Sequence, residues 1–370
     1  MKYGRAILAD VVGYVPGEQP SGTVIKLNTN ENPYPPSPRV LDALWSLAAE
    51  NVRKYPDPVS LRLRQACAQR YGYENADWVI AGNGMDELLS LVIRTFVDPG
   101  DTILSPYPTY TLYETLSALH GAKYAAVDLD ENFQLPESLF STPAKLCFLP
   151  RPNAPTGVCA PREAVERFCK TFAGIVVIDE AYVDFADDNC MDFPQRFENV
   201  IVMRTFSKSF SLAGMRLGIA VARPEVIAEF MKVKDSYNLN LATQAAGLAA
   251  IEDYDYMLNS ASRVKATRSR LSAALRDFGF TVPKSDSNFV LAQWNGTPSA
   301  REIFERLKAD SIYVRYFKVR RLENALRITV GTDSEVDALL DALRTIVYEK
   351  KPQPPAPESS TSFESLQEDS

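Results

Sequence analysis

The chain has 370 residues, of which 46% are hydrophobic and 24% charged, and its net charge is −7. This length and composition predict a soluble globular enzyme with one large and one smaller domain. The negative charge argues against nucleic acid or an anionic membrane as the main partner. No apolar run approaches membrane-spanning length, and the N-terminus turns polar too soon for a signal peptide, so we expect a cytoplasmic protein.

Cysteine and histidine content narrows the possible chemistry. The five cysteines include no C-x-x-C pair, so we expect reduced thiols rather than disulfides or metal ligands. The single histidine, His120, leaves no multi-histidine metal site. We interpret it as structural, because it ends an amphipathic run just before Gly121, where a basic residue suits a helix C-terminus.

The chain begins with an extended arm, which we assign to residues 1–35. Helices are expected at 38–50, with proline in the first turn, and at 60–71, where Ser60 can cap the helix. A strand at 78–81 then leads through a glycine-rich turn into another helix. Such a turn exposes backbone N–H groups and the positive end of the helix dipole, which together favour a phosphate.

Further apolar runs alternate with helices and predict an α/β domain over residues 36–250, with a mainly parallel sheet of about seven strands. The runs are 102–104, 145–149, 175–178, 199–203 and 217–221, with helices at 109–119 and 161–172. Ligand-binding groups gather at the carboxyl ends of parallel strands. Gly82, Asn153, Asp179 and Lys208 fall at these ends.

A smaller α+β domain is predicted over residues 251–350, after a largely helical stretch. Its strands are expected near 288–292, 311–314 and 325–330, and its helices near 300–308 and 333–347. The sequence from Thr332 to Glu335 has the pattern of a capping box. Residues 351–370 are rich in proline, serine and acidic residues, and we expect a disordered tail.

The segment 204–218 carries the most informative cluster of polar residues. A lone lysine, Lys208, lies among the hydroxyls of Thr205, Ser207 and Ser209, and Arg216 follows it. A lysine among apolar neighbours loses solvation, so its pKa falls and its amine can condense with an aldehyde. Hydroxyls and an arginine are usual ligands of a phosphate ester. Pyridoxal 5'-phosphate (PLP) carries both an aldehyde and a phosphate.

Two charged residues interrupt apolar strands. Asp179 follows four apolar residues, and a buried carboxylate needs a cationic or hydrogen-bonding partner, which a pyridinium nitrogen would provide. A helix cap is the simpler interpretation; a Walker B strand is not supported, because no P-loop motif is present. Arg327 lies within the apolar strand 325–330, so either a substrate carboxylate or a protein carboxylate must pair with it.

These motifs resemble those of a known family. The segment from Ser207 to Gly218 matches the pattern S-K-x-F-x-[LM]-A-G-x-R-x-G of the fold-type I, PLP-dependent aminotransferases at every defined position. Over nearly residues 10–348 the chain resembles the histidinol-phosphate aminotransferase family, a class II branch of these enzymes. The motifs that carry this resemblance are Leu27-Asn-Thr-Asn-Glu-Asn-Pro, Lys54-Tyr-Pro-Asp-Pro, Gly82-Asn-Gly-Met-Asp-Glu, Ser207-Lys-Ser-Phe-Ser-Leu-Ala-Gly and Leu326-Arg-Ile-Thr-Val-Gly-Thr.

The resemblance implies a role for each site residue. The catalytic residues are Lys208, which would hold PLP and then act as general base, and Asp179 and Tyr182, which would contact the ring nitrogen and the phenolic oxygen. Tyr110 would stack on the ring, and Asn153 stands where the family's N-P-x-N-P-T-G loop has its oxygen-binding asparagine, although Arg151 and Ala154 depart from that loop. The phosphate ligands would be Met85, Asp86, Thr205, Ser207, Arg216 and Tyr55, and the substrate ligands Arg327, Arg315, Tyr14 and Asn30.

Tyr55 would reach the neighbouring subunit, which implies a homodimer with shared active sites. The implied reaction moves the amino group between L-histidinol phosphate and 2-oxoglutarate in histidine biosynthesis. Arg315 is also compatible with an ordinary surface charge. Three other functions stay open: a threonine-phosphate decarboxylase-like lyase, a broader aromatic amino acid aminotransferase, and a PLP-binding regulator, although no DNA-binding segment is visible.

Overall fold

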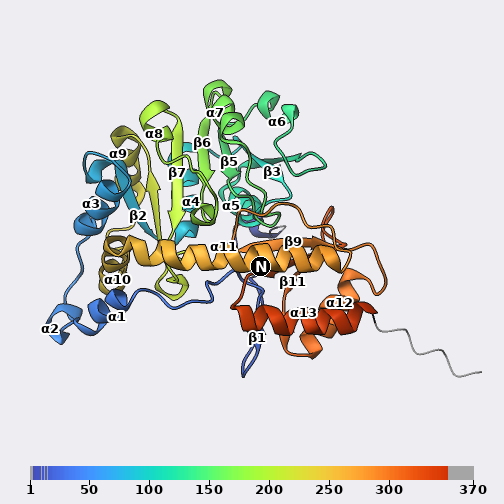
Figure 1. The fold of residues 1–370 in the computed structure, drawn as a ribbon. Helices are drawn as coiled ribbons and strands as arrows, with labels where there is room; N and C mark the ends of the chain where they lie inside the picture. The colour runs from blue at the N-terminus through green and yellow to red at the C-terminus, as the bar shows by residue number, and fades with distance from the viewer. Residues whose placement is uncertain (1–2, 10, 12, 15, 349–370) are drawn as a thin grey trace, which may run out of the picture.

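The computed structural model describes residues 3–9, 11, 13–14 and 16–348 and contains a seven-stranded sheet in the order β2-β8-β7-β6-β5-β3-β4 (Figure 1). Only β8 runs antiparallel to its neighbours. The sheet confirms the predicted α/β fold. The strands are β2 (Val79–Asn83), β3 (Thr102–Tyr107), β4 (Lys123–Asp128), β5 (Leu146–Pro150), β6 (Ile175–Asp179), β7 (Val200–Thr205) and β8 (Leu217–Val221).

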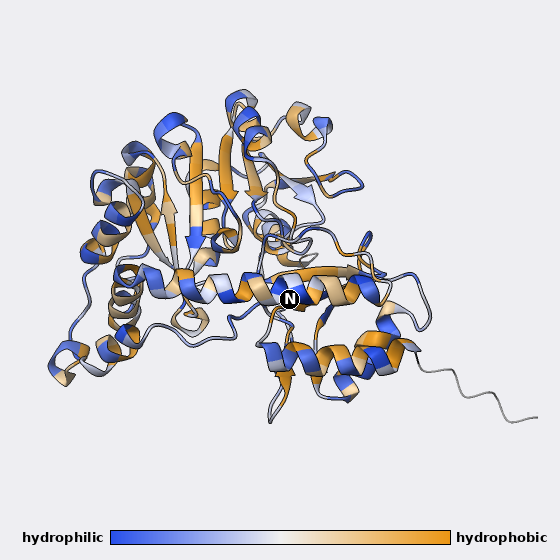
Figure 2. Cartoon of the chain, in the orientation of Figure 1, coloured by the Kyte–Doolittle hydropathy of each residue, from blue (hydrophilic) through white to orange (hydrophobic). Residues whose placement is uncertain are grey.

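The sequence analysis missed β4, which pairs only with β3 at the edge of the sheet. Its side chains are exposed or half-buried, so it lacks the continuous apolar run by which β5, β6, β7 and β8 were recognised. Those four central strands are buried almost throughout, and most of their residues are hydrophobic, although β7 ends in a hydrophilic stretch (Figure 2). A strand covered by helices on both faces reads as an unbroken hydrophobic run.

Helices cover both faces of the large sheet. Alternate strand residues pack against α4, α5 and α9 on one face, and against α3, α7, α10 and α11 on the other. The helices are α1 (Pro38–Trp45), α2 (Ala49–Val52), α3 (Leu61–Arg70), α4 (Met85–Phe96), α5 (Leu112–His120), α6 (Glu137–Ser141), α7 (Arg162–Thr171), α8 (Phe193–Arg196), α9 (Pro224–Val233), α10 (Leu241–Glu252), α11 (Tyr254–Asp277), α12 (Ala300–Ala309) and α13 (Asp333–Tyr348). Short 3-10 helices are η1 (Ala6–Ala9), η2 (Ala76–Trp78), η3 (Val183–Phe185) and η4 (Ala213–Met215).

The C-terminal part forms two smaller sheets. Strands β11 (Arg315–Tyr316), β12 (Ala325–Thr329) and β9 (Phe289–Gln293) form an antiparallel sheet. Strand β1 (Ile25–Lys26), in the N-terminal segment expected to be an extended arm, pairs in parallel with β10 (Ile312–Tyr313). The N-terminal segment is therefore attached to the C-terminal part through residues 25–26. The boundary near residue 250 stays a prediction; it falls close to the junction of α10 and α11.

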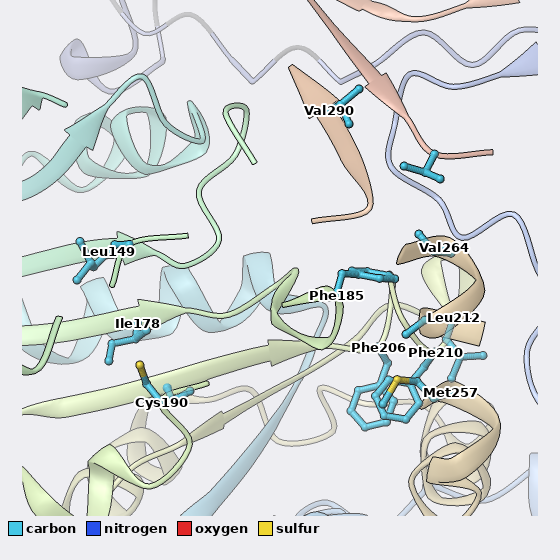
Figure 3. Packing of buried hydrophobic residues seen from close by; sticks show 14 of the residues in the cluster. Leu149, Ile178, Phe185, Cys190, Phe206, Phe210, Leu212, Met257, Val264 and Val290 are labelled. Atoms are coloured by element: carbon cyan, nitrogen blue, oxygen red, sulfur yellow. The ribbon is translucent and has the colours of Figure 1, made fainter. Parts of the chain in front are cut away.

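Helix α11 links the two regions (Figure 1). It packs against α10 and η3 and, further along, against β9 and α13. The core around it is continuous: Phe206, Phe210 and Leu212 meet Met257 of α11, and Val264 lies near Phe185 (Figure 3). The segment around Lys208 is therefore anchored by apolar packing on both sides.

Helix ends account for most of the differences in detail. The helix expected at 38–50 is two helices, α1 and α2, separated by Ser46–Ala48. Ser60 does not cap α3; its φ is 48°, and the Asp57 carboxylate accepts hydrogen bonds from Val59 N and Leu61 N instead. The capping box before α13 is confirmed by reciprocal hydrogen bonds between Thr332 and Glu335.

The structure also bears on the expectations for the cysteines, the histidine and membrane-spanning segments. All five cysteines are free thiols, and the His120 Nε2 atom lies 2.5 Å from the Val97 carbonyl oxygen, at the end of α5. Among the described residues, no helix is both long and apolar enough to cross a membrane. The tail predicted at 351–370 lies outside the described residues.

Candidate active site

A cavity of about 810 Å³ opens at the carboxyl ends of the large-sheet strands, between that sheet and the small one. It brings together residues that are far apart in the sequence. Most of the predicted site residues line it: Tyr14, Asn30, Met85, Asp86, Tyr110, Asp179, Tyr182, Thr205, Ser207, Lys208, Arg216, Arg315 and Arg327. Tyr55 and Asn153 are not in its wall.

Lys208 follows strand β7 and faces the cavity with its amine. Its Nζ donates a hydrogen bond to the Thr29 carbonyl oxygen at 3.1 Å and lies 5.8 Å from the centre of the Tyr182 ring. Burial, together with the positive charges of Arg327 and Arg216, lowers the pKa of Lys208 to about 8. A neutral, nucleophilic amine is therefore available near physiological pH.

Asp179 is buried at the end of β6, in the wall of the cavity. Its Oδ2 accepts a hydrogen bond from the Tyr113 hydroxyl at 2.5 Å, and its Oδ1 accepts one from the Ala181 N–H at 3.0 Å. Burial raises the pKa of Asp179 to about 6, although these two hydrogen bonds oppose the rise. Among the described residues, no cationic side chain forms an ion pair with this carboxylate, so a cationic ring nitrogen would complete its environment.

Tyr182 and Asn30 form a hydrogen-bonded pair at the domain junction. The Asn30 Nδ2 donates to the Tyr182 hydroxyl oxygen at 3.0 Å. Asn30 has a φ of 59° and is held on both sides, by the Thr329 hydroxyl and by the Asn288 amide. The pair fixes the Tyr182 hydroxyl at the cavity wall, where it can donate to a ligand oxygen.

The start of helix α4 faces Arg216 and Ser207 across one end of the cavity. Arg216 Nη1 lies 3.5 Å from the Ser207 hydroxyl, and Nη2 lies 3.2 Å from the Asp86 carboxylate. A Cβ on Gly84 would lie 2.5 Å from Arg216 Nη2, and one on Gly218 would lie 2.7 Å from Met85 N. The two glycines thus leave a narrow cradle of N–H groups, hydroxyls and a guanidinium, which fits a phosphate.

We predict that Gly84→Ala weakens binding of a phosphorylated cofactor more than it destabilises the fold. Gly84 has a φ of 80° and a ψ of 163°, a backbone region adopted almost only by glycine, so alanine there costs about 1–3 kcal/mol, and the new methyl group would also displace Arg216. Gly72→Ala is the matched control, because Gly72 has a φ of 77° but nothing near its Cβ position. Equal losses of cofactor affinity in the two variants, measured by titration of the apoprotein, would contradict this prediction.

Arg327 and Arg315 are register partners on the antiparallel strands β12 and β11. Arg327 donates one hydrogen bond, from Nη2 to the Asn28 carbonyl oxygen at 2.8 Å. Its Nε is buried without a hydrogen-bond partner, and no described carboxylate forms a salt bridge with its guanidinium. A protein carboxylate is therefore not its partner in the described chain. Two adjacent guanidinium groups that line one cavity make an anion site.

Aromatic rings form another part of the wall. Tyr110 packs edge-on against Tyr14, with ring centroids 5.5 Å apart, and its hydroxyl donates to Asp86 Oδ1 at 3.2 Å. The ring is thus held by the same carboxylate that contacts Arg216. A planar ligand whose phosphate sits in the cradle would extend along this tyrosine toward Asp179.

Asn153 and Tyr55 lie outside the cavity lining, and their predicted cofactor contacts stay predictions. Asn153 Nδ2 donates to the Pro108 carbonyl oxygen and to the Thr156 hydroxyl, each at 3.0 Å, so its amide holds the loop together. The neighbouring Ala154 lines the cavity in its place. Tyr55 is 80% exposed and stacks on Tyr237, with centroids 4.4 Å apart.

Further residues in the cavity wall and behind it were not predicted from the sequence. Tyr113 carries no motif signal, because an aromatic residue in an amphipathic helix reads as core. Arg204 forms buried salt bridges with Glu180 at 2.9 Å and Asp184 at 2.7 Å. Asp184 also accepts a hydrogen bond from Ser209, beside Lys208, at 2.5 Å. Ser209 thus fastens the lysine segment and does not line the cavity.

The chain is similar to proteins of known families. Residues 22–343 match the family described as aminotransferase class I and II. The chain is 45% identical over 348 residues to a histidinol-phosphate aminotransferase of Crocosphaera subtropica, covering 93% of this chain and 99% of the relative. It is 48% identical over 338 residues to one from a Synechocystis species, covering 90% and 95%.

A solved structure is also similar. The histidinol-phosphate aminotransferase of Sinorhizobium meliloti, in complex with pyridoxal 5'-phosphate, superposes with a TM-score of 0.86 at 27% identity and covers 94% of this chain and 98% of its own. The cofactor is therefore PLP, which the cradle, the buried carboxylate and the lysine fit. The chain belongs to the class I and II aminotransferases and, within them, to the histidinol-phosphate aminotransferase family.

Proposed function

We propose that this protein transfers the amino group between L-histidinol phosphate and 2-oxoglutarate, as a step of histidine biosynthesis in the cytoplasm. The observation that carries the substrate proposal is the pair of adjacent arginines, Arg315 and Arg327, in the cavity that Lys208 faces. A phosphate monoester carries about −1.5 to −2 charges at neutral pH. Two adjacent guanidinium groups therefore balance the charge of a phosphate better than they balance the single charge of a carboxylate.

The residues of the chain divide into cofactor and substrate ligands. The N–H groups of Met85 and Asp86, the hydroxyls of Thr205 and Ser207 and the guanidinium of Arg216 would hold the cofactor phosphate. Asp179 would face the ring nitrogen, Tyr182 the phenolic oxygen and Tyr110 the ring face. When bound, PLP supplies an aldehyde for the amino group and a ring that accepts electrons from the substrate carbon.

Lys208 performs the proton transfer in this proposal. Its amine first holds the cofactor and is released when the amino substrate arrives. Once free, the neutral Nζ would accept the proton from the substrate Cα and deliver it to the carbon of the cofactor's aldehyde group. The Thr29 carbonyl oxygen, 3.1 Å from Nζ, orients the amine between these positions.

Capture of PLP by the apoprotein should accelerate with pH up to about 8 and then level off. The aldehyde reacts with the neutral amine, and burial lowers the pKa of Lys208 to about 8 from its ordinary 10.5. Below that pKa, each pH unit should change the rate by about tenfold. Stopped-flow absorbance measures the rate directly; a profile that keeps rising to pH 10 would mean that the lysine is not perturbed.

The two arginines would bind different anionic groups of the substrates. Arg327, deeper and partly unsatisfied, would bind the α-carboxylate of glutamate and of 2-oxoglutarate. Histidinol phosphate has no carboxylate, so its phosphate would occupy the same corner and also engage Arg315. Tyr14 and Asn30 complete this end of the cavity.

The function is tested by spectroscopic half-reactions of the PLP-loaded protein. Histidinol phosphate should convert the bound cofactor to its amino form, and 2-oxoglutarate should convert it back. Release of carbon dioxide from phosphothreonine without 2-oxoglutarate would instead identify a decarboxylase-like lyase. Equal rates with phenylalanine and histidinol phosphate would identify a broader aromatic aminotransferase.

We further propose that the protein is a homodimer. Residues 41–61 expose an apolar surface at one end of the molecule, around α1 and α2 (Figure 1). Trp45 is 83% exposed and Tyr55 is 80% exposed there, with Leu41, Val52, Val59 and Leu61 beside them. A patch of this kind favours a protein interface. A second copy that covers it would bring Tyr55 toward the phosphate cradle of its partner.

Trp45→Glu should therefore both dissociate the dimer and weaken PLP binding. A carboxylate in an apolar interface loses its solvation, so association should weaken by at least about a hundredfold. Sedimentation velocity gives the mass, and titration gives the cofactor affinity. Tyr348→Glu, at an exposed position on α13, is the control and should change neither. A monomeric wild-type protein would refute the proposal.

A further inference from the structure

The first turn of helix α5 holds a residue that no motif assigns to the site. Tyr113 is fully buried, yet its hydroxyl lies 2.5 Å from Asp179 Oδ2, within hydrogen-bonding distance. Its ring stacks on Phe148 of β5, with centroids 4.6 Å apart and an interplanar angle of 14°. The ring is thus fixed by packing, and the hydroxyl has one direction in which to donate.

Asp179 receives few other contacts. Besides Tyr113 from α5, only the Ala181 N–H donates a hydrogen bond to the Asp179 carboxylate among the described residues. The charged groups that face it are Asp86 from α4 and the adjacent Glu180, and both oppose its ionisation. Burial opposes ionisation as well, so the two hydrogen bonds are what favour the anion.

Tyr113 itself stays protonated. Burial and the neighbouring Asp179 hold the pKa of its hydroxyl well above the ordinary tyrosine value. It is therefore a donor at every physiological pH, and Asp179 is its acceptor. Hydrogen bonds to a charged group are stronger than those between neutral groups.

We propose that Tyr113 is a positioning residue that keeps Asp179 anionic and aimed at the cofactor ring. The hydroxyl occupies one lone pair of the carboxylate and leaves others directed into the cavity. Asp179 then meets the ring nitrogen as an oriented negative charge. This inference rests on the proposed role of Asp179.

Tyr113→Phe tests it, because the ring and its stacking on Phe148 are kept. PLP should bind the apoprotein roughly ten to a hundred times more weakly, the fold-change that corresponds to one charge-assisted hydrogen bond. Infrared titration of the apoprotein, with Asp179→Asn to identify the carboxyl band, should show the pKa of Asp179 moved upward from about 6. 3-Fluorotyrosine at position 113, a stronger donor, should move it downward.

Tyr124→Phe is the matched control. Tyr124 is half-buried, and its hydroxyl lies 2.5 Å from the Ser105 hydroxyl, in the same sheet but without contact to Asp179. On the Asp179→Asn background, Tyr113→Phe should change PLP affinity by less than about twofold, since the charge it serves is gone.

Each outcome is decisive. Wild-type affinity and an unmoved infrared titration in Tyr113→Phe would overturn the inference, and so would equal losses in Tyr113→Phe and Tyr124→Phe. An Asp179→Asn protein that binds PLP and turns over normally would overturn the proposed role of Asp179 itself. Should Tyr113→Phe not fold, the fluorotyrosine protein still decides, through the direction of its shift.

Discussion

Lys208→Ala should reduce transamination by at least about a thousandfold, because it removes both the amine that holds PLP and the general base. The visible absorbance of the lysine-linked cofactor should disappear. PLP should still bind, since the cradle around Arg216 is unchanged, but it should dialyse away. Absorbance spectra and single-turnover measurements with histidinol phosphate check both effects.

Lys265→Ala is the control for this loss of a partly buried lysine. Lys265 Nζ donates hydrogen bonds to the Ala186 carbonyl oxygen and the Asp187 carboxylate, outside the cavity. Its replacement should leave turnover unchanged. Added methylamine should partly restore the proton transfer in Lys208→Ala, because a small free amine fits the space left. Full transamination by Lys208→Ala with PLP alone would exclude the lysine as base.

The second large effect is expected at Arg327. Arg327→Lys keeps the charge but loses the planar fork, so the glutamate half-reaction should slow by roughly a hundredfold or more in kcat/KM. The histidinol phosphate half-reaction should also slow, because the phosphate occupies the same corner. Arg315→Gln should act differently: it should slow the histidinol phosphate half-reaction at least about tenfold and affect glutamate little.

The ratio of the two half-reactions separates these roles. Rapid mixing of PLP-loaded protein with either amino donor gives each rate independently. Arg321→Lys is the matched control, because Arg321 donates to the carbonyl oxygens of Leu129 and Asp130 and does not line the cavity. If Arg327→Lys leaves glutamate kinetics intact, the substrate carboxylate binds elsewhere.

Local patterns in the sequence were sufficient for the central elements of the fold. Four buried strands read as unbroken apolar runs because helices cover both of their faces. The edge strand β4 was missed because its side chains are largely exposed. Ser60 was expected to cap α3. The carboxylate of Asp57, three residues before Ser60, instead accepts hydrogen bonds from Val59 N and Leu61 N.

The features of the candidate site also divide into those predicted from the sequence and those that only the tertiary structure shows. Lys208, Asp179 and Arg327 were predicted from sequence because a charge among apolar residues needs a partner, and Arg216 because hydroxyls and an arginine suit a phosphate ester. Their common cavity, the register that places Arg315 opposite Arg327, and the turning of Asn153 away from the wall were decided by tertiary packing. Tyr113 is the clearest case: in sequence it is a core aromatic, and only the approach of α5 to the end of β6 brings its hydroxyl to Asp179. The sequence by itself determined which groups carry charge, and the tertiary structure decided which of them meet, because such contacts join residues that lie far apart along the chain.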